Sequence, residues 1–172
     1  MSKKNPTFIC HHDHQHCIDD ALTSAKRICK DRQQRLTPIR ELVLRMIWSS
    51  HKPLGAYDLL PSLANAGFNS APPTVYRALE FLQELGLVHR LASLNAFVGC
   101  AHPEKAHSGH FFICKQCQQA HEITSSDVNL ALETHAQQLG FSIEQETVEI
   151  LGTCPECQLA NQKSEEHNAN LS

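Results

Sequence analysis

The sequence predicts an α+β protein with an N-terminal winged-helix domain over residues 18–100 and a C-terminal α/β domain over residues 101–158. Three observations support this prediction. Amphipathic helical segments fill most of the first half and end in two short strand patterns, and two Cys-x-x-Cys pairs lie in the second half. The charge also changes sign: residues 1–100 carry 12 Lys and Arg against 8 Asp and Glu, whereas residues 101–172 carry 3 against 10.

Composition places the chain among soluble globular proteins, because 172 residues with 41% hydrophobic and 19% charged content can bury a core. No stretch approaches the roughly 18 apolar residues of a membrane span, and the first ten residues lack the apolar run of a secretory signal. We therefore expect a cytoplasmic protein. In a reducing compartment, 8 cysteines and 12 histidines favour metal ligation over disulfides.

The first three helical segments are expected over residues 18–34, from Pro38 onward, and over residues 56–66. Thr37 can cap the second helix, and Pro38 suits its first turn. Apolar residues at steps of three and four form its core-facing stripe: Ile39, Leu42, Val43, Met46 and Ile47. Pro61 removes one amide hydrogen bond from the third segment, so the first turn of that segment should be irregular.

The fourth segment, residues 72–85, has the pattern of a recognition helix, bracketed by prolines at its start and Gly86 beyond its end. Its buried stripe is expected at Val75, Ala78, Leu79 and Leu82. Thr74, Tyr76 and Arg77 are then exposed near the N-terminal end, where a recognition helix presents its side chains. Strand patterns over residues 87–91 and 95–99 add a hairpin and complete a winged helix. The alternative is a generic helical domain whose exposed side chains are merely solvated.

Positive charge is concentrated in the first helices. Between Lys26 and Lys52 lie six further basic residues: Arg27, Lys30, Arg32, Arg35, Arg40 and Arg45. A surface of this kind suits contact with the phosphates of duplex DNA. Charge alone leaves a solvated helix face as the alternative.

Four cysteines of the second half form the two Cys-x-x-Cys pairs: Cys114, Cys117, Cys154 and Cys157. Four thiolates at this spacing make a closed tetrahedral zinc site, which holds a fold together without doing chemistry. We expect the first pair on a turn between two strands, then a helix over residues 126–139 capped by Ser126, and a β segment over residues 141–151. The alternatives are a thioredoxin-like redox pair at residues 154–157, which requires a preceding βαβ unit, and four inert core thiols.

A second group of metal-ligand side chains lies around the junction of the two domains: His89, Cys100, His107, His110 and Glu122. Mixed sulfur, nitrogen and oxygen ligands suit zinc better than iron(II), whose sites favour histidine and carboxylate without thiolate. His121 should point away from its neighbour Glu122 on a strand, so we do not expect it to be a ligand.

Both ends of the chain are expected to be disordered tails, residues 1–17 and 159–172. The first contains two cysteines and four histidines between residues 10 and 17, which can bind zinc or copper weakly without defining a shaped site. The second is rich in Asn, Gln, Ser and Glu.

Three segments resemble the ferric uptake regulator (Fur) family of metal-dependent repressors. They are the run Pro-Pro-Thr-Val-Tyr-Arg-Ala-Leu from residue 72, the run Arg-Leu-Thr-Pro-Ile-Arg from residue 35, and the paired Cys-x-x-Cys motifs. The resemblance spans residues 20–158. Within the family, residues 55–60 (Gly-Ala-Tyr-Asp-Leu-Leu), residues 87–90 (Leu-Val-His-Arg) and Cys100 are most similar to the zinc uptake regulator branch.

The resemblance implies a homodimer, formed through the C-terminal domain, that binds double-stranded operator DNA and represses zinc-uptake genes with zinc as co-repressor. Two zinc ions per subunit follow: a structural ion on the four cysteines and a regulatory ion on His89, Cys100, His107 and Glu122. The run from residue 107 to 114 is effectively one residue longer than the common family run, so His110 could replace His107 as the zinc ligand. We favour His107. Four residues are expected to contact the DNA: Tyr57, Thr74, Tyr76 and Arg77. Among them, Arg77 should read a guanine edge.

Two other functions are alternatives. The same fold can sense iron or peroxide, and Cys100 is the feature against that hypothesis. A zinc hydrolase or nucleobase deaminase would use Glu122 as a general base. The deaminase signature requires His-x-Glu and Pro-Cys-x-x-Cys, but here His121 directly precedes Glu122 and Pro155 lies inside the cysteine pair. We therefore do not expect an enzyme, a membrane partner or a small organic substrate.

Overall fold

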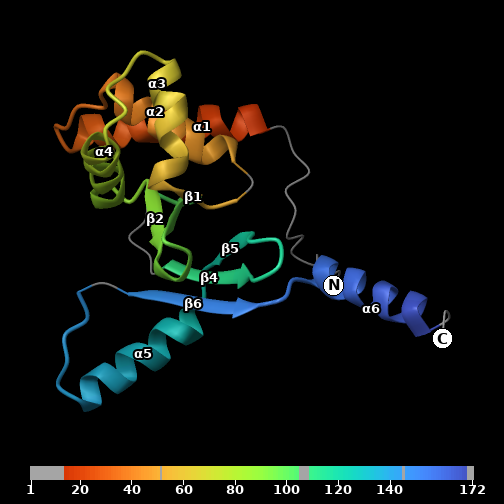
Figure 1. Cartoon of the computed structure of the whole chain (residues 1–172). Helices are drawn as coiled ribbons and strands as arrows, with labels where there is room; N and C mark the ends of the chain where they lie inside the picture. Colours follow the sequence, from red (N-terminus) through yellow and green to blue (C-terminus); the bar gives the residue numbers. More distant parts are fainter. Residues whose placement is uncertain (1–13, 51, 105–108, 145, 170–172) are drawn as a thin grey trace. The chain divides into compact units, whose positions relative to one another are not determined.

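The computed structural model describes residues 14–50, 52–104, 109–144 and 146–169. These residues form two compact units, which we call the N-terminal unit (residues 14–104) and the C-terminal unit (residues 109–169) (Figure 1). Residues 101–104 belong with the N-terminal unit, whereas the sequence predicts a domain boundary after residue 100. Among the described helices, none combines the length and the apolar character that crossing a bilayer requires.

Helices build most of the N-terminal unit: α1 (His14–Asp31), α2 (Pro38–Ser49), the 3-10 helix η1 (Ala56–Leu59), α3 (Leu60–Asn65) and α4 (Pro72–Glu84). Helix α1 begins at His14 rather than at residue 18, and residues 1–13 of the expected tail lie outside the described residues. Thr37 occupies the N-cap of α2 as predicted, but its side chain makes no capping hydrogen bond. Pro61 lies in the first turn of α3, and η1 precedes it, so the irregular start of this segment is confirmed.

One apolar core joins these helices. The predicted stripe of α4 is buried: Val75, Ala78, Leu79 and Leu82 are 0 to 3% exposed. Phe81 is also buried, although it lies outside the predicted stripe. The guanidinium carbon of Arg40 lies 3.4 Å from the centroid of its ring, so a cation covers this aromatic side chain.

Helix α4 ends as its glycine predicts. Gly86 has a φ of 71°, a left-handed conformation that glycine adopts without steric cost. Its N–H donates to the carbonyl of Gln83, and the N–H of Leu87 donates to the carbonyl of Leu82, the two hydrogen bonds of a Schellman motif. This turn leads the chain directly from the helix into the strand β2.

The wing is a small antiparallel sheet in the order β1-β3-β2, formed by β1 (Leu54–Gly55), β2 (Val88–Leu91) and β3 (Ala96–Gly99). The predicted hairpin is confirmed, with His89 opposite Val98 and Val88 opposite Gly99. A short 3-10 turn, η2 (Ala92–Leu94), connects β2 and β3. Strand β1 is not predictable from the sequence, because two residues are too short for a strand pattern.

The C-terminal unit contains a second sheet in the order β5-β4-β6: β4 (Gly109–Cys114), β5 (Ala120–Ile123) and β6 (Thr147–Gly152). Strand β5 is antiparallel to β4, whereas β6 is parallel to it. A parallel neighbour requires a crossover, which α5 (Ser126–Gln138) supplies. The N-cap of α5 is Ser125, whose hydroxyl accepts a hydrogen bond from the Val128 N–H, so the predicted cap at Ser126 is wrong by one residue.

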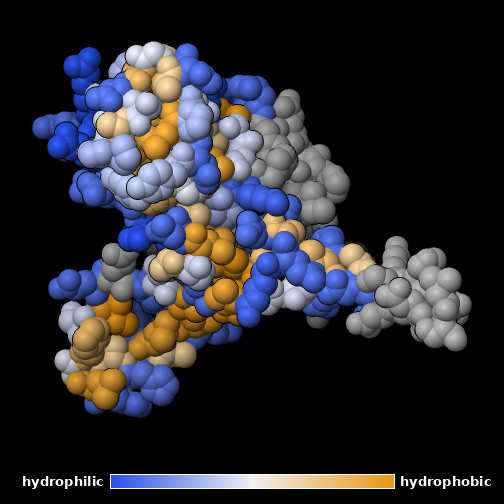
Figure 2. All heavy atoms as spheres, in the orientation of Figure 1, coloured by the Kyte–Doolittle hydropathy of each residue, from blue (hydrophilic) through white to orange (hydrophobic). Residues whose placement is uncertain are grey.

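One feature of the C-terminal unit differs from the expectations. Helix α6 (Pro155–Ala169) occupies most of the stretch expected to be a disordered tail. Large apolar side chains are also exposed on this unit, among them Leu130, Leu139 and Phe141, which are 63, 82 and 68% exposed. Figure 2 shows this apolar surface in orange over α5. Apolar surface of this extent marks an interaction site more often than a solvated face.

Candidate metal centres and nucleic-acid interface

The first cysteine pair lies on the turn between β4 and β5, as predicted. Cys114 is the last residue of β4, and the chain reverses through Gln118, which has a φ of 61°. Two hydrogen bonds close the turn, from the Gln118 N–H to the Cys114 carbonyl and from the Cys114 N–H to the Gln119 carbonyl. Both thiols of the pair are thereby held on one tight loop.

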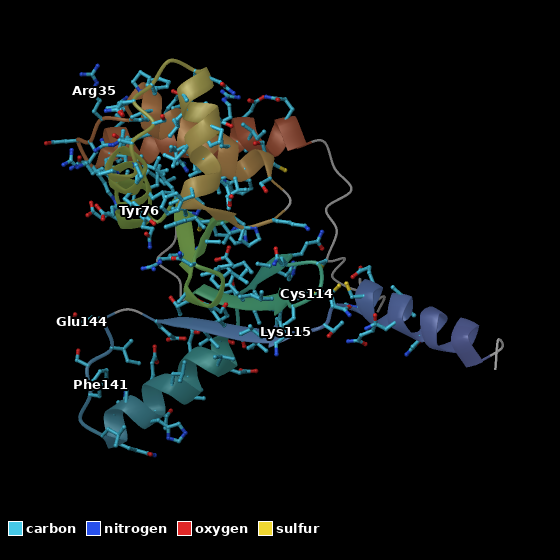
Figure 3. The ribbon with its side chains drawn as sticks, viewed as in Figure 1. Arg35, Tyr76, Cys114, Lys115, Phe141 and Glu144 are labelled. Carbon is cyan, nitrogen blue, oxygen red and sulfur yellow. The ribbon has the colours of Figure 1, made fainter. Side chains whose placement is uncertain are left out.

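The second pair lies at the start of α6. The Cys154 carbonyl accepts the hydrogen bond of the Gln158 N–H, so this cysteine opens the helix, and Pro155 follows at its first position. Strand β6 ends at Gly152, which is paired with Cys114 in the parallel ladder. This pairing places the second cysteine pair, which follows β6, beside the first pair, and Figure 3 shows Cys114 beside the start of α6.

The four sulfur atoms, which we call the cysteine quartet, fit a zinc ion. All four lie within 4.8 Å of one another, and the sulfurs of Cys117 and Cys154 are 3.8 Å apart. A tetrahedral site with zinc–sulfur bonds of about 2.3 Å places its sulfurs about 3.8 Å apart. Between the parallel strands β4 and β6 the chain forms the antiparallel strand β5 as well as the crossover helix α5, so the described unit before Cys154 is β-β-α-β rather than the simple βαβ unit of a thioredoxin-like pair. Closed zinc coordination is therefore the chemistry that the quartet supports.

The protonation of the quartet is uneven. Burial opposes ionisation of the Cys114 thiol, but hydrogen bonds from the backbone N–H groups of Cys117, Cys154 and Gln116 outweigh it and lower its pKa to about 6. Burial raises the pKa of the Cys154 thiol. Cys114 therefore offers a thiolate at neutral pH, whereas a metal must displace the proton of Cys154.

Two members of the second ligand group lie together in the wing. His89 is on β2, and Cys100 follows β3, where its N–H donates to the Leu87 carbonyl at 3.0 Å. Leu87 directly precedes β2 and is two residues from His89, so this pairing places the His89 and Cys100 side chains on the same face of the sheet. Their ligand atoms lie within 4.8 Å of each other, and Cys100 is 2% exposed. We call them the His89–Cys100 pair.

The other candidates belong to the C-terminal unit or lie outside the described residues. Glu122 on β5 is opposite Phe111, whereas His110 is opposite Ile123, so the two polar side chains are on opposite faces of that sheet. His110 is 1% exposed, and its Nε2 lies 2.7 Å from a carboxylate oxygen of Glu146. His107 lies outside the described residues. The His110–Glu146 contact is not predictable from the sequence, because no local pattern links residues 36 positions apart.

The predicted DNA-contacting residues differ in exposure. Tyr57 is 65% exposed on η1, Tyr76 is 36% exposed on α4, and Arg77 beside it is exposed. Figure 3 labels Tyr76 and Arg35 on the surface of the N-terminal unit. Thr74 is half-buried, whereas the sequence predicts an exposed side chain at this position. Its N–H donates to the Ala71 carbonyl in the first turn of the helix.

The basic residues of α1 and α2 fall into two groups. Some are engaged within the N-terminal unit: Lys26 is 3.5 Å from Glu41, Arg27 pairs with Glu104, and Arg32 donates to the Glu84 carbonyl. Arg40 donates to the Arg35 carbonyl at 2.7 Å and covers Phe81. The charge pattern predicts phosphate contact for Arg40, but both of these contacts give it a structural role. Lys30 and Arg35 are exposed and suit a phosphate-facing surface.

A winged helix is a DNA-binding fold, and four clustered thiolates form a metal site. Together the two units define the class of metal-binding, DNA-binding proteins. Residues 31–151 match the model of the ferric uptake regulator family. The zinc uptake regulation protein of Escherichia coli (strain K12) is 38% identical over 139 residues, which cover 80% of this chain and 81% of that protein. The chain belongs to the ferric uptake regulator family.

Two solved structures extend the comparison. A zinc uptake regulator complexed with zinc and DNA is 36% identical, with a TM-score of 0.81, and the match covers 84% of this chain and 97% of that one. The crystal structure of holo XcZur is 46% identical, with a TM-score of 0.75, and the match covers 82% of this chain and 99% of that one. The similarity therefore includes both units.

Proposed function

We propose that this chain is a zinc-responsive transcriptional repressor that binds operator DNA as a homodimer, with zinc as co-repressor of zinc-uptake genes. The observation that carries the proposal is the similarity, over both units, to a zinc uptake regulator complexed with zinc and DNA. The exposed tyrosines and Arg77 supply groups for the groove and the backbone. The exposed apolar side chains of the C-terminal unit supply a surface that a second subunit can cover.

Each subunit is proposed to hold two zinc ions. The cysteine quartet holds the structural ion, for which the sulfur spacing is the support. The regulatory ion is assigned to His89, Cys100, His107 and Glu122. The nearness of the first two supports this assignment, and the involvement of His110 with Glu146, on the sheet face away from Glu122, favours His107 over His110.

The proposed switch follows from where these ligands lie in the chain. Two come from the wing of the N-terminal unit and one from β5 of the C-terminal unit. Zinc adds binding free energy only to arrangements that bring its ligands together, so it shifts the population of unit orientations. A dimer with fixed orientation can place two recognition helices in successive major grooves, whereas a mobile dimer loses affinity.

The thiol of Cys100 is the feature that separates zinc from the alternative signals. Iron(II) sites favour histidine and carboxylate, and a thiolate in the set selects zinc. The relatives found are named as regulators, and we propose no catalytic activity for this chain.

The test combines metal counting with DNA binding on wild type and Cys100→Ala. The probe is a duplex selected from a random library with zinc-loaded wild-type protein. Wild type should hold two zinc ions per subunit and bind the duplex tightly only with zinc. Cys100→Ala should hold one, keep its fold and lose tight binding. Equal DNA affinity with and without zinc would contradict the proposed function, and iron in the purified protein would favour the alternative signal.

A further inference from the structure

The single tryptophan of the chain lies against the strand that leads to Cys100. Trp48 is in the last turn of α2, and its indole covers Gly99, the last residue of β3. A Cβ added at Gly99 would lie 2.4 Å from Cε2 and 2.5 Å from Nε1 of the indole. Carbon atoms do not approach each other so closely, so only glycine leaves room for the ring. Gly99 does not have a positive φ, so space rather than backbone conformation requires this glycine.

The two faces of this strand end carry different partners. Gly99 is opposite Val88, whereas Cys100 is opposite Leu87, which lies two residues before His89. Because side chains alternate along a strand, the indole covers one face and the His89–Cys100 pair lies on the other. A shift of the strand that carries Cys100 therefore moves the surface on which Trp48 rests.

Helix α2 connects this contact to the DNA-reading helix. It packs against both β3 and α4. Its buried side chains Val43, Leu44 and Ile47 are 0 to 3% exposed and belong to the same core as the stripe of α4. Closely packed interiors transmit displacement because they leave little free volume. Helix α4 also contacts β2 directly, so the tryptophan provides a second route from the wing to the recognition helix.

We propose that Trp48 and Gly99 are positioning residues that couple zinc binding at the His89–Cys100 pair to the placement of the recognition helix. The indole fixes where β3 ends and therefore where the Cys100 sulfur lies relative to α2. This inference rests on the proposed function, because it assigns a mechanical role within the same zinc response.

The first test is a double-mutant cycle on the ratio of DNA affinity with zinc to DNA affinity without it. Gly99→Ala and Trp48→Ala should each lower this ratio by roughly tenfold, within the range of allosteric couplings. In the Trp48→Ala background there is room for the added methyl, so Gly99→Ala should then change the ratio by less than about twofold. Additive effects, or single variants with the wild-type ratio, would overturn the proposal.

Gly152→Ala is the matched control, because nothing lies within 4 Å of a Cβ added there and its backbone is not left-handed. This control should keep the wild-type ratio. Circular dichroism and the structural zinc content of each variant report whether the fold is kept.

A second measurement needs no tryptophan substitution and so stays decisive if a variant fails to fold. The emission of the single tryptophan should change as the second zinc equivalent binds to wild type, and not when zinc is added to Cys100→Ala. Unchanged emission while zinc switches on DNA binding would sink the inference and leave the proposed function standing. Absence of zinc-dependent DNA binding in wild type would instead refute the proposed function, and this inference with it.

Discussion

Individual arginines in the N-terminal unit have different roles that the charge pattern does not distinguish. Arg77 is exposed on the recognition helix, whereas Arg40 binds a backbone carbonyl and covers the Phe81 ring. Both count equally in a sum of charges, although of these two only Arg77 has a guanidinium group free to enter a groove of DNA. The difference depends on tertiary contacts, which sequence spacing does not encode.

Replacement of Arg77 with Ala should weaken binding to the selected duplex by about 1–3 kcal/mol and relax specificity at one base position. The side chain is exposed, so the unfolding temperature should change little. Fluorescence anisotropy against the duplex and single-base variants of it measures both effects.

Arg40→Ala is the matched comparison for that experiment. It should lower stability through loss of the ring contact and the carbonyl hydrogen bond, with a smaller change in base preference. Equal base preference of Arg77→Ala and wild type would show that another residue reads the base.

At the scale of elements, caps and glycines were the most informative signals. Gly86 ends α4, Pro61 makes the start of α3 irregular, and the hairpin after α4 is present. The glycine and proline predictions are confirmed because each depends on a local backbone property of the residue itself, and the hairpin is confirmed because two adjacent strand patterns lie a few residues apart. Strand β1 and helix α6 were missed, since β1 depends on pairing with β3 and α6 has a polar sequence without an apolar stripe.

The same reasoning explains what was predictable of the metal sites. The four cysteines were recognised from spacing alone, and the structure brings them together. The second ligand group was recognised by residue type and resemblance, but the choice between His107 and His110 depends on which sheet face each side chain occupies. Only the register of β4 against β5 gives that information for His110.

Replacement of Gly86 with Ala tests the cap of the recognition helix. A Cβ at a φ of 71° is strained, so the variant should be less stable by about 1 kcal/mol. Thermal or urea unfolding measures this loss, with Gly152→Ala as the unstrained control. Equal stability of the two variants would show that the chain accommodates the left-handed residue elsewhere.

For the molecule as a whole, the two units should respond differently to loss of the structural zinc. The core of the N-terminal unit contains no quartet residue, whereas the described C-terminal unit has a small sheet and exposed apolar side chains. A structural zinc contributes about 10–16 kcal/mol, which is folding free energy for the part that it closes.

Cys114→Ser should therefore unfold the C-terminal unit and abolish dimerisation, while the N-terminal unit keeps its helices. Light scattering gives the mass, and hydrogen exchange locates the loss. A dimer that persists without zinc in the quartet would contradict the structural role. Protons compete with zinc for thiolates, so wild-type zinc affinity should fall as the pH falls, and more steeply below about pH 6, where zinc must displace a proton from Cys114 as well as from Cys154.

The parallel pairing of β4 with β6 also constrains how the protein is made. Cys114 is synthesised 40 residues before Cys154, its neighbour in the quartet. The ribosome must release Cys157 before a zinc ion can acquire its fourth sulfur, whereas the whole winged helix has already emerged by then. Because domains fold as they emerge, N-terminal ones first, the DNA-reading half is completed before the quartet can close around its ion.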